Sequence, residues 1–158
     1  MLRITNEKGG KRSMIAIGAD HGGYLLKDEL IKEFEGEIDF KDFGTFSTES
    51  VNYPEIAFKT AESVASGECE AGILICRSGI GMDIAANKVK GIRCANVATT
   101  KAARLCKEHN NANMIALAAD EITLEAAKEI IYMWLSSEFL GGRHQTRVDM
   151  ITEYENKK

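Results

Sequence analysis

Short apolar runs alternate with amphipathic segments along most of this chain. Five of the runs have the length and composition of buried β-strands, and they cover residues 14–18, 38–43, 72–76, 92–98 and 114–118. The segments between and after them carry apolar residues at helical spacing, which predicts helices at 24–34, 53–65, 80–88, 101–107, 124–135 and about 145–155. This alternation predicts an α/β fold: a doubly wound, Rossmann-like, five-stranded parallel sheet with helices on both faces.

Composition and charge narrow the class of protein further. The chain has 158 residues, of which 44% are hydrophobic and 28% charged, as in a folded globular protein. Residues 1–13 lack the apolar core of a signal peptide, so we interpret them as a tag or a disordered extension and residues 14–158 as a single domain. The net charge of −4 argues against a nucleic-acid partner. No apolar run is long enough to span a membrane, so a cytoplasmic location is expected.

Residues with catalytic potential stand at the boundaries of several predicted strands. Sheets of this kind bind ligands beyond the carboxyl ends of their strands. Asp20 and His21 follow the first predicted strand, Cys76 and Ser78 stand at the end of the third, and His109 precedes the fifth. We therefore expect these side chains to gather at one site.

The segment that starts at Cys76 carries the strongest chemical signal. Glycines at 79 and 81 allow a tight turn whose backbone N–H groups point inward at a helix N-terminus. Such a turn binds anions and favours a thiolate, so the segment can supply both a base and donors for developing negative charge. The alternative is a buried structural cysteine beside an ordinary glycine turn. A phosphatase loop is excluded, because Met82 stands where that loop requires arginine.

Cofactor and metal motifs are weak or missing in the sequence. The other cysteines, Cys69, Cys94 and Cys106, form no CxxC pair with Cys76, and we interpret them as small buried hydrophobes. A dinucleotide fingerprint fits poorly, because Ile84 stands in place of its third glycine and the motif does not follow the first strand. The cysteine spacing thus indicates neither a zinc ribbon nor a thioredoxin-type redox pair.

The remaining candidates each allow two interpretations. Asp20 could bind sugar hydroxyls or cap a helix, and His109 could transfer protons or be a structural histidine in the turn after a helix. Arg143 and Arg147 lie one helical turn apart, so both guanidinium groups can face one anion. A solvated basic surface would have the same spacing.

Taken together, the motifs resemble the ribose-5-phosphate isomerase B family, which includes the galactose-6-phosphate and allose-6-phosphate isomerases. The resemblance begins at Met14 and covers nearly all of the chain that follows, in the family's order and spacing. It rests on IAIGADHGG at 15–23, DFGT at 42–45, SVNYP at 50–54, GILIC at 72–76, GIGMDIAANKVKGIR at 79–93, EHNNAN at 108–113 and GGRHQTRV at 141–148.

The resemblance implies an aldose–ketose isomerase that interconverts ribose 5-phosphate and ribulose 5-phosphate through an enediolate, without metal or redox cofactor. By position, Cys76 is the base, Ser78 helps to hold the enediolate, and His109, helped by Asp20, opens the sugar ring. The positions that match substrate contacts are His21, Arg143 and Arg147 for the phosphate, Tyr53 and Asn110 for the sugar, and the N–H groups of Gly79, Ile80, Gly81 and Met82 for the enediolate.

The resemblance also implies how subunits cooperate. In the family the site is shared, with His109 and its loop donated by the partner subunit. This chain is therefore expected to form a homodimer whose C-terminal helix extends to the partner, while association of dimers into tetramers is left open. The expected ligand is a small phosphorylated sugar.

Two positions depart from the family pattern. Arg77 stands where the family has glycine, and Asp120 replaces an arginine that binds phosphate in many relatives. A carboxylate repels a phosphate dianion. We therefore expect Arg77 to compensate for Asp120 at the mouth of the site, either by pairing with Asp120 or by binding the phosphate in its place. The change keeps alternatives open: another sugar phosphate (hexose or tetrose), a non-phosphorylated sugar, or a catalytically silent sugar-phosphate-binding module. A flavodoxin-like nucleotide binder is compatible with the fold but not with the first loop.

Overall fold

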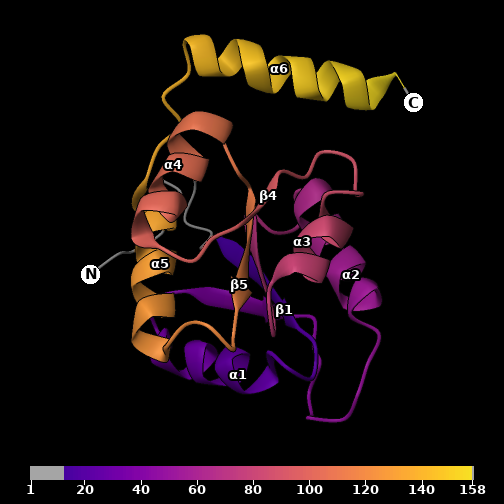
Figure 1. The fold of residues 1–158 in the computed structure, drawn as a ribbon, viewed down its shortest axis with the longest axis vertical. Helices are drawn as coiled ribbons and strands as arrows, with labels where there is room; N and C mark the ends of the chain where they lie inside the picture. Colours follow the sequence, from indigo (N-terminus) through magenta and orange to yellow (C-terminus); the bar gives the residue numbers. More distant parts are fainter. Residues whose placement is uncertain (1–12, 158) are drawn as a thin grey trace.

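Five parallel strands form one sheet at the centre of the structure, a computed structural model that describes residues 13–157 (Figure 1). The strands are β1 (Met14–Ala19), β2 (Asp39–Asp42), β3 (Ala71–Cys76), β4 (Cys94–Asn96) and β5 (Met114–Ala118). Their order is β2-β1-β3-β5-β4. Strand β2 is therefore added on one side of β1 and the later strands on the other side, so the strand order reverses between β1 and β3. This is the predicted doubly wound α/β fold. The tag or extension expected over residues 1–13 falls outside the described residues, except for Ser13.

Helices cover both faces of the sheet (Figure 1). One face packs against α1 (Tyr24–Glu33), α4 (Thr100–Asn110) and α5 (Leu124–Ser136). The other packs against α2 (Tyr53–Ala65) and α3 (Ile80–Ala86). Successive side chains of each strand enter opposite cores, as the pleat of a strand requires: Ile73 and Ile75 face α1 and α5, whereas Leu74 and Cys76 face α2 and α3.

The central strand is β3, which pairs with β1 on one side and β5 on the other. Ile73 is paired with Ile17 of β1 and with Ile115 of β5. Every residue of β3 is buried, as expected for a strand at the centre of a parallel sheet. Cys76, the last residue of β3, is paired with Ala118 of β5, whereas the pairing with β1 ends one residue earlier, at Ile75.

Helix α6 (Arg143–Asn156) stands apart from the two helical layers and crosses the end of the molecule at which β5 begins (Figure 1). The chain turns into it through Gly141 and Gly142, whose positive φ angles of 65° and 57° are readily adopted only by glycine. Val148 is its one buried residue among those described. Whether α6 reaches a partner subunit stays a prediction.

Some element ends differ from the sequence-based expectation. Helix α4 runs to Asn110, so His109 lies in its last turn and not in the turn that follows. The helix starts early because Thr99 Oγ1 accepts a hydrogen bond from the backbone N–H of Ala102 (3.1 Å), and it ends where Asn111 takes a left-handed conformation. Within residues 13–157, no helix is both long and apolar enough to cross a membrane.

Trp134 fixes the segment between α4 and β5, and its replacement offers a test of the fold. The ring is 1% exposed, and its indole N–H donates to the carbonyl oxygen of Ala112 (3.1 Å). We expect Trp134→Phe to lower the free energy of unfolding by about 1–3 kcal/mol, because the buried carbonyl loses its donor. Tyr132→Phe, which removes a part-buried hydrogen bond to Glu37 from the same helix, should cost less.

The measurement is urea unfolding followed by circular dichroism at one fixed protein concentration, since Trp134 is the only tryptophan and its fluorescence is lost. Equal stabilities for the two variants would show that the indole hydrogen bond contributes little.

Candidate active site

Cys76 ends β3 with its sulfur beside a backbone donor. The N–H of Gly79 donates to Cys76 Sγ at 3.0 Å, in a buried position. Gly79 has a φ of 74°, and a Cβ atom there would lie 2.7 Å from Asn96 Oδ1, so this tight turn requires glycine. Asn96 Nδ2 in turn donates to the carbonyl oxygen of Ser78 (3.2 Å). The turn therefore fixes one donor on the sulfur.

The other three cysteines are poor candidates for a base. Burial raises the pKa of Cys69 and raises that of Cys106 to about 11. Burial, followed by the nearby carboxylate of Asp83, also raises the pKa of Cys94. A thiol with a raised pKa stays protonated near neutral pH and cannot accept a proton. These observations support the interpretation of these three residues as small hydrophobes.

The first turn of α3 lies beside Cys76 and presents backbone donors. The N–H of Ile80, the first residue of this turn, donates to Ser78 Oγ (3.3 Å), and the cap residue Gly79 has no side chain that could cap the helix. Tyr53, at the start of α2, packs against Gly81 so closely that a Cβ atom on Gly81 would lie 2.7 Å from its ring. Ser78, Tyr53 and the first-turn N–H groups thus surround one region next to the cysteine.

The loop after β1 is pressed against the end of β3. Asp20 Oδ1 accepts hydrogen bonds from the N–H groups of Gly22 (2.9 Å) and Gly23 (3.0 Å), so Asp20 closes this turn. The alternative role of Asp20 as the cap of α1 is wrong, because the cap residue is Gly23 and no side chain caps this helix. A Cβ atom on Gly23 would overlap the carbonyl oxygen of Ile75, so only glycine permits this approach.

His21 is oriented by the loop that precedes α2. Its Nδ1 accepts a hydrogen bond from the backbone N–H of Val51 (3.2 Å). A neutral histidine that accepts at Nδ1 carries its proton on Nε2, so His21 can offer an N–H donor at its other nitrogen. That donor suits an anionic oxygen of a ligand.

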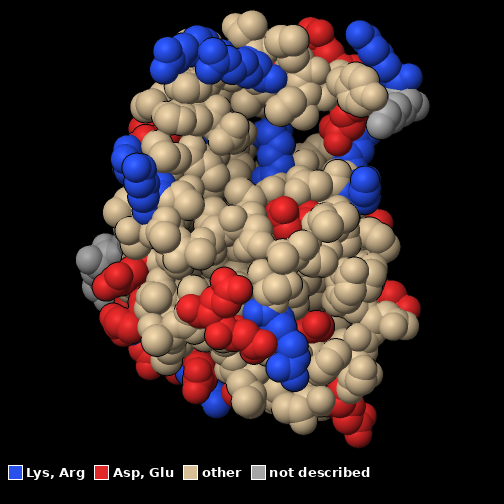
Figure 2. Space-filling model, viewed as in Figure 1, with Lys and Arg blue, Asp and Glu red and all other residues tan. Residues whose placement is uncertain are grey.

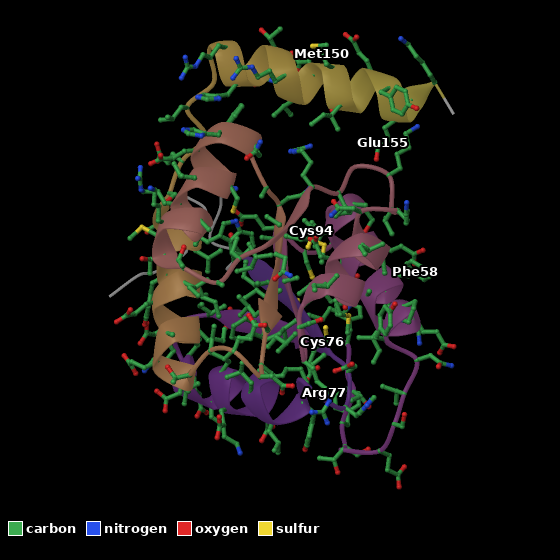
Figure 3. All side chains as sticks on the ribbon, viewed as in Figure 1. Phe58, Cys76, Arg77, Cys94, Met150 and Glu155 are labelled. Atoms are coloured by element: carbon green, nitrogen blue, oxygen red, sulfur yellow. The ribbon has the colours of Figure 1, made fainter. Side chains whose placement is uncertain are left out.

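Arg77 and Asp120 meet beside Cys76, as their sequence positions predicted. Arg77 Nη1 lies 3.6 Å from Asp120 Oδ2, and the two side chains are 67% and 55% exposed. The stem of Arg77 lies over Gly22, where a Cβ atom would come within 2.5 Å of Arg77 Cγ. Figure 3 shows Cys76 and Arg77 together at the end of the molecule opposite α6.

The remaining predicted residues lie at the other end of the sheet. His109 and Asn110 end α4, which leads into the amino end of β5, whereas Cys76 is paired with Ala118 at the carboxyl end of β5. Within one chain, therefore, His109 does not lie beside Cys76, and a single site needs the sharing between subunits that the resemblance implies. The reason is topological: a residue that precedes a parallel strand lies at the edge opposite to one that follows a strand.

A second cluster forms around His109. The ring of His109 stacks on that of His144 in α6, with centroids 4.3 Å apart and planes 9° from parallel. Partial burial, followed by His109 and the two neighbouring arginines, lowers the pKa of His144. Arg143 and Arg147 are exposed on the first turns of α6, and Figure 2 shows basic side chains over this part of the helix. One chain thus carries two separate clusters. We call them the cysteine half-site (Cys76, Ser78, Tyr53, Asp20 and His21) and the histidine half-site (His109, Asn110, Arg143, His144 and Arg147).

Three residues with contacts to these half-sites were missed from the sequence. Asn96 braces the turn after Cys76, His144 stacks on His109, and the guanidinium of Arg93 contacts the end of α4. Arg93 and His144 lie inside motifs that were recognised, but spacing alone did not distinguish them from their neighbours.

Among residues 13–157, no three side chains of His, Cys, Asp or Glu gather as a metal site would require. The expected metal-free reaction stays a prediction.

Comparison with known proteins identifies the family. A family model described as ribose/galactose isomerase matches residues 15–151. The solved structure of ribose-5-phosphate isomerase B from Clostridium thermocellum is 49% identical, with coverage of 91% of this chain and 98% of that one and a TM-score of 0.89. The corresponding enzyme from Mycoplasma genitalium, solved with bound ribulose-5-phosphate, is 36% identical, with coverage of 92% and 97% and a TM-score of 0.87.

A relative with another named substrate is similarly related. D-erythrulose-4-phosphate isomerase from Pectobacterium atrosepticum is 40% identical over 146 residues, which cover 91% of this chain and 96% of that protein. The substrates named for these proteins differ, but isomerisation of a sugar phosphate is common to them. The family model and the relatives confirm the resemblance drawn from the motifs: the chain is an isomerase and belongs to the ribose/galactose isomerase family.

Proposed function

We propose that this isomerase interconverts ribose 5-phosphate and ribulose 5-phosphate, with Cys76 as the base that moves the proton. The observation that carries the proposal is the contact between Cys76 Sγ and the N–H of Gly79 at the end of the central strand. Relatives named ribose-5-phosphate isomerase B, one of them with bound ribulose-5-phosphate, support this choice of substrate.

The geometry around Cys76 suits an enediolate mechanism. The thiolate takes the proton from the carbon next to the carbonyl, and the electrons of that C–H bond form the carbon–carbon double bond while negative charge develops on the carbonyl oxygen. The hydroxyl group of Ser78 and the N–H groups in the first turn of α3 can donate to the enediolate oxygens. Cys76 then returns the proton to the neighbouring carbon, and a proton passes between the two oxygens. The net change is a shift of the carbonyl by one carbon.

The active unit in this proposal is a homodimer. The cysteine and histidine half-sites lie at opposite ends of one chain, so a complete site needs His109, Asn110 and the arginines from a second copy. A two-fold axis would form two such sites at once. Exposed apolar side chains support an interface of this kind: Phe58 on α2, Ile80 and Ile84 on α3, and Met150, Ile151 and Tyr154 on α6. Figure 3 labels Phe58 and Met150.

In the assembled site, His109 of the partner subunit would face the loop that carries Asp20 and transfer protons to open the sugar ring. Asn110 of the partner subunit would hold a substrate oxygen. His21 of this chain would bind the phosphate together with the partner's Arg143 and the partner's Arg147. A cytoplasmic location and further association into tetramers stay predictions.

A tetrose phosphate is the second candidate substrate. It is favoured by the Pectobacterium relative and by the Arg77–Asp120 pair, which changes the charge at the mouth of the cysteine half-site. The deciding experiment measures kcat/KM with pentose, hexose and tetrose phosphates on the purified protein. We expect the highest value with ribose 5-phosphate; a higher value with D-erythrulose 4-phosphate would move the assignment to the tetrose. No turnover with any of them would favour a silent binding module.

The role of Cys76 can be tested by removing its sulfur. Cys76→Ala should lower kcat at least about a hundredfold, because general-base loss has this size, while KM changes little. The matched control is Cys69→Ala, which removes a buried sulfur from the same core and should leave kcat near that of the wild type. Near-normal turnover in Cys76→Ala would make the assignment wrong and direct attention to Asp83.

The phosphate assignment predicts an effect on KM. Arg143→Ala and Arg147→Ala should each raise KM for ribose 5-phosphate about tenfold or more, since a charged hydrogen bond to phosphate is lost. Arg104→Ala, which removes an exposed arginine that is paired with Glu108 on α4, is the control. If both KM values stay unchanged, the phosphate binds elsewhere, and Arg77 becomes the first candidate.

The Arg77–Asp120 pair predicts a non-additive effect. Arg77→Gly should raise KM for ribose 5-phosphate, because it leaves the Asp120 carboxylate uncompensated beside the phosphate site. Arg77→Gly combined with Asp120→Arg should restore activity, and Asp120→Asn alone should not raise KM. Both groups are more than half exposed, so the effect should be modest and should shrink in high salt. A harmless Arg77→Gly would show that Arg77 has no part in binding.

A further inference from the structure

Arg93 directly precedes β4, and its side chain reaches the end of α4, the helix that carries His109. Its Nε donates to the carbonyl oxygens of Asn110 (3.0 Å) and Asn111 (3.2 Å), and its Nη2 donates to that of Asn111 (2.9 Å). Neither the sequence motifs nor the relatives' names assign a role to this side chain. The carbonyls that it binds belong to the residues directly after His109.

The end of a helix needs such donors. The last carbonyls of α4 have no partners within the helix and carry its partial negative charge. Asn111 stops the helix in a left-handed conformation with a φ of 46°, which a residue other than glycine rarely adopts. The planar guanidinium supplies several donors in a fixed arrangement, together with a positive charge. Arg93 therefore stabilises both the turn and the direction in which α4 ends.

The backbone of Arg93 is itself held in place. Its N–H donates to Asn113 Oδ1 (2.8 Å), and its carbonyl oxygen accepts from the N–H groups of Asn113 (3.1 Å) and Met114 (3.3 Å). Asn113 Nδ2 donates to the carbonyl oxygen of Gly91 (2.8 Å). The guanidinium thus extends from a fixed base, so it can transmit a defined geometry to α4.

The end of α6 contacts the same segment before β4 that carries Arg93. Glu155 Oε2 accepts a hydrogen bond from the N–H of Gly91 (3.0 Å), and Figure 3 shows Glu155 above this loop. Burial lowers the pKa of Arg93, and the carboxylate of Glu155 opposes this by raising it. Because His144 stacks on His109 at the other end of α6, both ends of that helix contact the elements that Arg93 joins.

We propose that Arg93 is the positioning residue of the histidine half-site: it fixes His109 and Asn110 in the orientation in which they act on the substrate. The proposal rests on the proposed function, since it assigns these two residues a role in a shared site. Arg93 touches no substrate; it acts through the carbonyl groups of Asn110 and Asn111.

The first test compares three single variants. Arg93→Met should lower kcat with ribose 5-phosphate about tenfold or more, because small displacements of catalytic groups have effects of this size, while KM changes little because the arginines of α6 stay in place. Arg93→Lys, which keeps the charge and one donor, should fall between Arg93→Met and the wild type. Arg104→Met, a control on α4, should keep wild-type kcat. A kcat for Arg93→Met within a factor of about two of the wild type would overturn the proposal.

The second test separates positioning from a general loss of stability. Chains with Cys76→Ala and chains with Arg93→Met are co-expressed with different affinity tags, and the mixed dimer is purified. One of its sites then combines the intact Cys76 of one chain with the intact Arg93 and His109 of the other chain. The mixed dimer should therefore recover about half of wild-type kcat. A variant that damaged its whole chain would not be rescued. A mixed dimer no more active than the Arg93→Met dimer contradicts the proposal.

A parallel mixture distinguishes this proposal from the proposed function. Mixed dimers of Cys76→Ala with His109→Asn should also recover activity if the site is shared. Recovery in that mixture but not with Arg93→Met would reject only the role of Arg93. Failure of both mixtures would reject the shared site, and the role of Arg93 with it.

Discussion

The end of β3 accepts backbone hydrogen bonds from the loops on both sides, and the cysteine half-site depends on them. The N–H of Asp20 donates to the carbonyl oxygen of Ile75 (3.2 Å), and those of Ala119 and Asp120 donate to the carbonyl oxygens of Cys76 (2.8 Å) and Arg77 (3.1 Å). These bonds extend the sheet pairing by one step beyond the strands. They bring the loops after β1 and β5 against Cys76, where the doubly wound topology places a ligand.

Much of this arrangement could be predicted from the sequence. The period of the apolar positions indicated the strands and helices of the described residues, and the apolar run before Cys76 placed that residue at the end of a buried strand. The pairing of Arg77 with Asp120 was one of two arrangements expected from their charges and from their departure from the family pattern. The position of His109 was harder, because the sequence shows that it precedes a strand but the assumed clustering ignored the direction of that strand. Contacts such as Trp134 with Ala112 depend on tertiary packing, which no local pattern reveals.

The candidate residues lie at opposite edges of the sheet, and the two edges hold their side chains in different ways. A buried strand end at the carboxyl edge holds Cys76, whereas helix ends at the other edge carry the half-buried His109 and the exposed arginines. With the roles that we propose, neither cluster holds a complete acid–base and phosphate-binding set. In the proposed homodimer each chain needs to position only one cluster at a given site, and the subunit interface determines how the two clusters meet.

Helix α6 combines this chemistry with weak anchoring. It joins the chain through two glycines with positive φ angles, and Val148 is its one buried residue among those described. Segments with few buried apolar contacts open with a lower free energy than the core of a sheet, and their amides exchange hydrogen sooner. The helix that carries the two arginines should therefore be among the first parts of an isolated chain to open. In the homodimer that we propose, burial of its apolar side chains by the second copy would order the helix and complete the substrate site in a single event.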